Sequence, residues 1–448
     1  MNRARWSALL DGIVYVVLTI VVWGVNAFQR GLWQDDVQAL GEAFRRSTRS
    51  FRALFSPDPS PLRRLTLIPS AIGWATPYPI ETLHVLCAAI WLAQGVLAGW
   101  IVSLLLPGRR WTRFAVVCLT LTATSDFVTG SIVALAYNVA ALFLLGAAGC
   151  ALLWIGRGRI VTLLFSVILL ACSLLTMEVA LPAVPFLALL FAWHGRRRYA
   201  GRVATLFAAW GLLLVPVAVI EWSFLRDPKS YAAVALVPMS RRDLAMRTIA
   251  LWLENFAPWR WAFARPEWYA RPPAVIPTAW MAAGAVFAAS LFLLRVGTKH
   301  DEATADERRH SVLLAALFVT MALAANAAYA GVRFSDIHYR THILSRIWAS
   351  MAIGILAGWA GTCWPRLRWA PYAAVTAFVF FGTWGAIERQ DFFSRHMARA
   401  SARARVDSRY RSCSSHEHGR DPSRDAAIRT LSGSTSGLPH EALAAIAL

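Results

Sequence analysis

Long apolar runs, separated by short basic ones, are the feature that most restricts how this chain can fold. A helix that crosses a bilayer needs roughly 20 mostly apolar residues, since in lipid only helices and closed barrels satisfy every backbone hydrogen bond internally. Of the 448 residues, 57% are hydrophobic, and many stretches meet that requirement. We therefore predict an all-α integral membrane protein rather than a set of soluble domains.

The apolar runs predict a bundle of about eleven transmembrane helices. The expected spans are residues 12–29, 82–106, 114–127, 131–155, 160–176, 180–194, 203–222, 277–295, 311–330, 347–364 and 369–387. The transmembrane domain then covers residues 1–395. Residues 396–448 form a polar, Ser- and Arg-rich tail that we expect to be disordered. No small-residue cleavage site follows the first run, so we expect an uncleaved helix rather than a signal peptide.

The distribution of positive charge predicts the orientation. The formal net charge is +20, but the arginines lie in short clusters between the apolar runs, so we attribute the charge to topology and expect no nucleic-acid partner. With a cytoplasmic N-terminus, five successive basic loops fall on the cytoplasmic side, as the positive-inside rule requires. They are residues 108–113, 157–159, 196–202, 295–309 and 366–368. We expect a multi-pass protein of a bacterial plasma membrane.

Two long loops, residues 30–81 and 223–276, are expected on the extracytoplasmic face, and function is expected there. The same topology places most acidic and amphoteric residues near the spans on this face. They are Asp35, Asp36, Glu81, His84, Asp126, Glu178, Glu221, Asp336, His338, Tyr339, Arg340, His342 and Arg346. Ionisable groups at membrane depth usually face a bundle interior or an aqueous cavity, so together they predict a polar cavity that opens outward.

The adjacent carboxylates Asp35 and Asp36 stand soon after the first span. Such a pair at a membrane surface can act as a general base, a metal ligand or both. The alternative is a pair of solvated acids that cap the following helix, because acidic residues are common at helix starts. His338 and His342 are four residues apart, but no Glu follows the first His in an H-E-x-x-H pattern, and we favour interfacial side chains over a metal site there.

Four segments in order resemble the GT-C superfamily of polytopic glycosyltransferases, which use lipid-linked sugar donors. The acidic pair is the first, and a stretch from Arg63-Arg-Leu-Thr to Pro77-Tyr-Pro-Ile-Glu-Thr-Leu-His84 leads into the second span. A hairpin carries Leu174-Leu-Thr-Met-Glu-Val-Ala-Leu-Pro182, and Tyr339-Arg-Thr-His-Ile-Leu-Ser345 resembles the late loop near the donor phosphate. The resemblance is at the level of pattern and spans roughly residues 10–350. One departure is Met177, where relatives often have Lys beside the Glu.

The resemblance implies that a sugar is transferred from a polyprenyl-phosphate donor to an acceptor hydroxyl on a glycan, a lipid or a protein, on the extracytoplasmic face. Asp35 or Asp36 would take the acceptor proton as general base. Arginine would stabilise the phosphate leaving group, because guanidinium binds phosphate oxygens bidentately. The substrate- and donor-binding residues implied in this way are Arg340, Tyr339, Arg346, Glu178, Asp126 and His84. Members of the superfamily differ in metal use, so the cofactor stays open, with a divalent cation at the acidic pair as one alternative.

Several of these residues also have structural explanations. Arg340 has the position of an interfacial anchor, Glu178 that of a helix-start acid favoured by the dipole, and Asp126 that of a cap for the fourth span. For the whole chain, the main alternative is a transporter or a flippase for lipid-linked glycans. That function predicts charges deep in the spans and helices broken near mid-membrane. The predicted spans have centres nearly free of charge, which favours the transferase.

Overall fold

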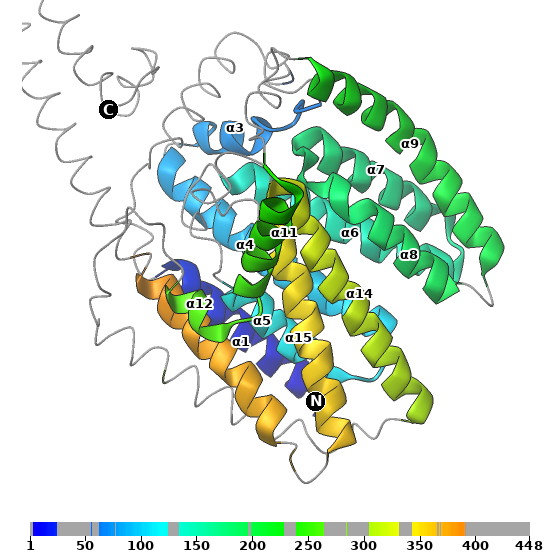
Figure 1. Cartoon of the computed structure of the whole chain (residues 1–448). Helices are drawn as coiled ribbons and strands as arrows, with labels where there is room; N and C mark the ends of the chain where they lie inside the picture. The colour runs from blue at the N-terminus through cyan, green and yellow to red at the C-terminus, as the bar shows by residue number, and fades with distance from the viewer. Residues whose placement is uncertain are drawn as a thin grey trace, which may run out of the picture.

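The computed structural model describes residues 3–24, 55, 62–76, 78–123, 134–195, 199–227, 239–263, 284, 304–330, 343–364, 367, 369–388 and 390. Within these residues every regular element is a helix, and no strand occurs. Figure 1 shows the helices as a bundle, with the N-terminal end of α1 (Arg3–Gly24) at its lower end in the view. The predicted span at residues 277–295 and the C-terminal tail lie outside the described residues, apart from residue 284.

Seven helical segments of the described chain are long and apolar enough to cross a membrane. They are Glu81–Leu105, Leu135–Arg157, Glu178–Gly195, Ala200–Phe224, Ala305–Ala327, Ile343–Cys363 and Trp369–Glu388. They belong to α4 (Pro79–Leu105), α6 (Leu135–Arg157), η5 (Glu178–Ala183) with α8 (Val184–Gly195), α9 (Ala200–Arg226), α14 (Ala305–Ala330), α15 (Ile343–Cys363) and a C-terminal helix over 369–388. Each coincides with a predicted span, which confirms an all-helical, multi-pass membrane protein.

The remaining helices fall into two groups. Three lie at predicted spans: α1, α5 (Arg110–Thr122) and α7 (Ile160–Thr176). Three others lie in the predicted outer loops: α3 (Ile68–Trp74), α11 (Arg241–Glu254) and α12 (Pro258–Phe263). The last three show that parts of both long loops are helical.

Helices α6 to α9 form one side of the bundle, and α14, α15 and the 369–388 helix form the other, with α4 and α5 between them (Figure 1). Glycines let three neighbours approach α5 closely, as small residues do in membrane helix pairs. A Cβ at Gly99 of α4 would clash with Val117, and one at Gly358 of α15 would clash with Thr112. Gly382 lies against the backbone oxygen of Thr122. Helix α5 is therefore buried along most of its length.

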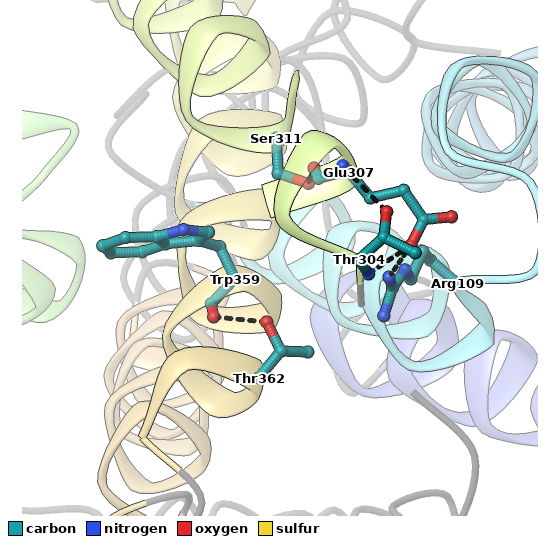
Figure 2. Close-up of polar contacts among 6 residues, drawn as sticks. All are labelled: Arg109, Thr304, Glu307, Ser311, Trp359 and Thr362. Carbon is teal, nitrogen blue, oxygen red and sulfur yellow. Dashed lines mark hydrogen bonds and ion pairs between the residues drawn. The ribbon is translucent and has the colours of Figure 1, made fainter. Parts of the chain in front are cut away.

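Loops predicted to be cytoplasmic meet at one end of the bundle. Arg109, between α4 and α5, forms an ion pair of 2.9 Å with Glu307 in the first turn of α14 (Figure 2). The backbone N–H of Thr304 donates to Oε2 of Glu307, and the N–H of Glu307 donates to Oγ1 of Thr304. This reciprocal capping box fixes the start of α14. The ion pair brings together two loops that the positive-inside rule had placed on one face.

Two further contacts join predicted cytoplasmic segments at the same end. Asp11 of α1 is buried and accepts hydrogen bonds from Arg110 at 2.8 and 3.2 Å, and it lies 3.5 Å from Arg113. Arg202, at the start of α9, donates to the backbone oxygen of Ile155 at the end of α6. The side of the membrane on which this end lies is still a prediction from charge, so we call it the basic end and the opposite one the outer end.

Candidate functional site

A buried arginine forms the centre of a polar cluster inside the bundle. The guanidinium carbon of Arg346 lies 3.5 Å from the centre of the Trp91 ring. Its Nη2 donates to Oε1 of Gln94 at 3.0 Å and to Oδ1 of Asn138 at 3.4 Å, and its Nη1 donates to the backbone oxygen of Thr120 at 3.4 Å. Gln94 Nε2 also donates to the backbone oxygen of Asn138 at 2.7 Å. We call these five residues the Arg346 cluster.

Along α4 and α5 the cluster lies about half a hydrocarbon core from the basic end, whereas along α6 and α15 it lies in the first turns. From Gln94 to the end of α4 at Leu105 the helix rises roughly 16 Å, and from Arg110 to Thr120 α5 rises roughly 15 Å. The hydrocarbon core of a bilayer is roughly 30 Å thick. The side chain of Arg346 has no exposed surface. Such a cation at membrane depth is costly unless it is paired or hydrogen-bonded, and such residues usually mark a functional site.

The sequence placed Arg346 just outside the tenth span, and this prediction is corrected. Helix α15 begins at Ile343, so Arg346 lies within its first turns. Its donors meet the oxygens of Gln94, Asn138 and Thr120, and its guanidinium lies over an aromatic ring, so protein groups stabilise the cation. Hydropathy along the sequence does not show these partners, because they lie on other helices.

The ends of several helices meet around the cluster. The ring of Trp23, next to the end of α1, lies edge-on to Trp91 at 5.6 Å between centroids. Nε1 of Trp91 donates to the backbone oxygen of Leu121 at the end of α5. Nδ2 of Asn138 donates to the backbone oxygen of Ala134 at the start of α6, and Arg346 itself lies near the start of α15.

Five of the predicted site residues lie outside the described residues, on the segments that leave from these ends. Asp35 and Asp36 follow α1, Asp126 lies between α5 and α6, and Tyr339 and Arg340 precede α15. The structure therefore brings together the helix ends from which these segments start. It leaves the positions of the five side chains as predictions.

A second polar contact fixes part of the first long loop near the outer end. Arg63 Nε donates to Oε2 of Glu178 at 2.9 Å, and its Nη2 donates to Oε1. The backbone N–H of Leu65 donates to the oxygen of Leu175 at 2.8 Å, and Oγ1 of Thr66 donates to the backbone oxygen of Thr176 at 2.6 Å. Residues 62–66 are thus held on the turn between α7 and η5. Glu178, predicted as a substrate-binding residue, has its two carboxylate oxygens bound by Arg63.

The remaining described site residue, His84, lies near the outer start of α4. Its side chain is buried, with 3% of its surface exposed. Glu81, one turn earlier, is exposed. The His84 side chain is therefore inside the protein, whereas the neighbouring Glu81 is at its surface.

Gln94 and Asn138 are functional candidates that the sequence reasoning missed. Each is an uncharged polar residue within a long apolar run, in α4 and α6 respectively. A search restricted to ionisable groups passes over such residues. An isolated Gln or Asn within a predicted span could have indicated a buried polar cluster, because a buried polar group needs a hydrogen-bond partner.

No group of three or more His, Cys, Asp or Glu side chains in the described part of the chain could share a metal ion. The acidic pair Asp35–Asp36 is not in that part, so a divalent cation there remains an open prediction. The Arg346 cluster consists of a cation, two amides, a carbonyl and an aromatic ring. Its chemistry suits the placement of positive charge rather than the binding of a metal.

Comparison with protein-family models and with curated proteins finds no match for this chain. The resemblance to the GT-C superfamily therefore remains a hypothesis from sequence patterns. What the sequence and the structure together establish is a polytopic, all-helical membrane protein.

Proposed function

We propose that this protein is a membrane glycosyltransferase of GT-C type, with about eleven spans and a cytoplasmic N-terminus. It would move a sugar from a polyprenyl-phosphate donor to an acceptor hydroxyl of a glycan, a lipid or a protein on the extracytoplasmic face. The observation that carries the proposal is the meeting of helix ends at the Arg346 cluster. The segments with the acidic pair, Asp126, Tyr339 and Arg340 all start there.

In the proposed reaction the acceptor oxygen forms a bond to the anomeric carbon, and the bond from that carbon to the carrier phosphate breaks. Asp35 or Asp36 takes the proton of the acceptor hydroxyl. The departing phosphate needs charge stabilisation more than protonation, and Arg340 with Tyr339 would supply it.

The described residues would act on this chemistry indirectly. Arg346 is fully buried and bound by protein groups, so we assign it a positioning role. It would hold together the helix ends from which the segments with the reacting groups start. It would also add positive charge near the start of α15. Glu178 would position the first outer loop through Arg63 rather than contact the substrate. Asp126 and His84 remain candidates for acceptor binding.

The test is transfer of labelled sugar from a panel of polyprenyl-phosphate donors by membranes that contain wild type, Asp35→Asn or Asp36→Asn at matched expression. A general base contributes on the order of 10²–10⁴-fold, so one variant should lose at least about 100-fold in rate. Asp306→Asn is the matched control, because Asp306 is an exposed acid in the first turn of α14 at the basic end. Equal rates for both Asn variants and the control would exclude the acidic pair as the base.

A flippase or transporter is the second candidate, and one observation favours it. Buried charged groups within spans and helices that end inside the bundle are typical of transport proteins, and Arg346 and the end of α5 have these features. Proteoliposomes with a fluorescent lipid-linked glycan separate the two functions. Movement of that lipid between leaflets with no glycosylated product, at the same rate in the Asn variants, would support transport instead.

A further inference from the structure

Part of the second long loop reaches the middle of the bundle. Nε1 of Trp252, in α11, donates to the backbone oxygen of Val319 at 3.3 Å. Trp261, in α12, has no exposed surface, and its ring lies 4.9 Å from that of Phe378. From Val319 to the end of α14 at Ala330 the helix rises roughly 16 Å, and Phe378 lies roughly 15 Å from Glu388. Both contacts are thus about half a hydrocarbon core below the outer ends of α14 and of the 369–388 helix.

The turn between α11 and α12 is held by protein groups at this depth. Nδ2 of Asn255 donates to Oγ of Ser345 at 2.9 Å, and Nε1 of Trp261 donates to the backbone oxygen of Asn255 at 3.3 Å. The hydroxyl of Ser345 donates in turn to the backbone oxygen of Ala322. Irregular backbone is tolerated at membrane depth where it is buried in protein. Asn255 has no exposed surface and meets that condition.

One face of α11 is apolar and exposed. The exposed fractions of Met246, Ile249 and Leu253 are 61%, 43% and 50%. Their spacing of three and four residues places them on one side of the helix. Thr248 and Leu251, on the side toward α14, are buried. We call Met246, Ile249 and Leu253 the apolar face.

The first turn of α11, at the opposite end from the α11–α12 turn, is charged. Ser240 caps the helix, and its hydroxyl accepts from the N–H of Asp243 at 3.1 Å. Arg241 and Arg242 in the first turn are exposed. Three of the five charged residues of α11 are therefore in its first turn, the end farthest from the turn that lies deep in the bundle, and Arg247 and Glu254 follow along the helix.

The charges near the turn are neutralised as a pair. Arg260 Nη2 lies 2.8 Å from Oε1 of Glu254, whose side chain is 11% exposed. The Arg260 side chain is long and partly exposed, so its head group can extend away from the turn. This ion pair lowers the cost of having both residues beside a membrane-buried segment.

We propose that α11 and α12 form a re-entrant segment that enters the membrane from the outer end, with its apolar face against the acyl chains of bilayer lipids. Three observations support lipid as the partner of this face. Trp252 and Trp261 lie deep in the bundle, the first turn of α11 is charged, and the apolar face is exposed. The spans also present exposed apolar side chains, for example Leu164 of α7. Such a surface in water would be unfavourable by about 25 cal/mol for each Å² exposed.

The test measures membrane depth along α11. Single cysteines at positions 244 and 253, in a protein without its native cysteines, are labelled with bimane in vesicles that contain phosphatidylcholine with a doxyl quencher at acyl carbon 5 or 12. A re-entrant helix places the two positions roughly 13 Å apart in depth. We expect stronger quenching by carbon-12 doxyl at Leu253→Cys, and by carbon-5 doxyl at Leu244→Cys. Leu164→Cys is the lipid-facing control.

Other results would overturn the proposal. Equal quenching of both positions by carbon-5 doxyl would show that α11 lies flat at the interface. Quenching at position 253 by aqueous iodide, or by neither lipid, would show that water or another part of the chain covers the apolar face. If the cysteine-free protein does not fold, benzoylphenylalanine at position 253 of the otherwise native chain replaces the label. Photo-crosslinking to phospholipid at 253 but not at Asp243 is then the expected result, and its absence rejects lipid contact.

Discussion

Arg63 and Glu178 are joined by two hydrogen bonds between a guanidinium and both oxygens of a carboxylate, although 115 positions separate them in the sequence. Their side chains are 16% and 27% exposed. The pair connects the first long loop to the turn between α7 and η5. It therefore limits where the segment between α1 and Arg63, which carries the acidic pair, can lie.

Reversal of this ion pair should be tolerated better than the loss of either charge. Arg63→Glu should lower the stability of the detergent-solubilised protein by about 1.5–3 kcal/mol, the usual value of a hydrogen bond to a charged group. The double variant Arg63→Glu with Glu178→Arg should recover part of that loss in thermal unfolding. Arg64→Glu, at the exposed neighbouring arginine, is the control and should change little. A double variant no more stable than Arg63→Glu would contradict the importance of the pair.

Loss of the buried cation should destabilise the fold. Arg346→Gln removes the guanidinium donor of Gln94 Oε1 and one donor each of Asn138 Oδ1 and the Thr120 backbone oxygen, and an unsatisfied buried acceptor costs about 1–3 kcal/mol. We expect a lower unfolding temperature and a smaller monodisperse fraction in size-exclusion chromatography. Arg157→Gln, at the exposed end of α6, removes the same charge as a control. Equal behaviour of the two variants would mean that the cluster does not hold the helix ends.

The close approach of the 369–388 helix to α5 makes a specific prediction about glycine. In Gly382→Ala the new Cβ would overlap the backbone oxygen of Thr122, and overpacking of this kind costs about 1–3 kcal/mol. Gly211→Ala, in α9, meets no atom within 4 Å and should be neutral or gain about 0.5–1 kcal/mol from helix propensity. Thermal unfolding of the two variants measures the difference. Similar unfolding temperatures would show that the two helices can separate without cost.

Orientation can be tested with a membrane-impermeant maleimide on intact bacterial cells. Arg159→Cys and Thr304→Cys are at the basic end, and Tyr78→Cys is an exposed position next to the outer start of α4. With a cytoplasmic N-terminus, only Tyr78→Cys should react before lysis, and all three should react after it. Unmodified protein reports the background from native cysteines. The opposite pattern would reverse the topology, and labelling of all three positions before lysis would contradict the grouping of the basic loops.

The apolar runs of α4, α6 and α9 were sufficient to predict these spans, because lipid-exposed helices must be apolar along their length. Hydropathy placed the third span at 114–127, whereas α5 covers Arg110–Thr122. Arg110 and Arg113 lie in the first turns of this helix at the basic end and share one carboxylate partner, Asp11 of α1. The error at Arg346 has a different cause, because that side chain is acceptable inside α15 only through partners distant in sequence.

The site was predictable only in part. Parity of the spans predicts that the ends of α1 and α5 and the starts of α6 and α15 share one face, and the structure places these helix ends together at the Arg346 cluster. The contacts of Glu178 and Arg346 depend on how α4, α5 and α7 pack, and no local pattern carries that information. The second outer loop was expected on the extracytoplasmic face, and no pattern in its sequence indicated which of its residues pack against the spans. Trp252, Asn255 and Trp261 instead attach it to α14, α15 and the 369–388 helix.

The shortness of α5 has a consequence for biosynthesis. Its thirteen residues rise roughly 20 Å, too little to cross a bilayer alone, and it has three threonines among its buried residues. When the ribosome has made α4 and α5, the partners on α15 and the 369–388 helix do not yet exist. The nascent hairpin must wait, shielded by the insertion machinery or held shallowly by α1 and α4, until the last third of the polypeptide emerges. Truncated chains that end before α15 should therefore be substrates for membrane proteases.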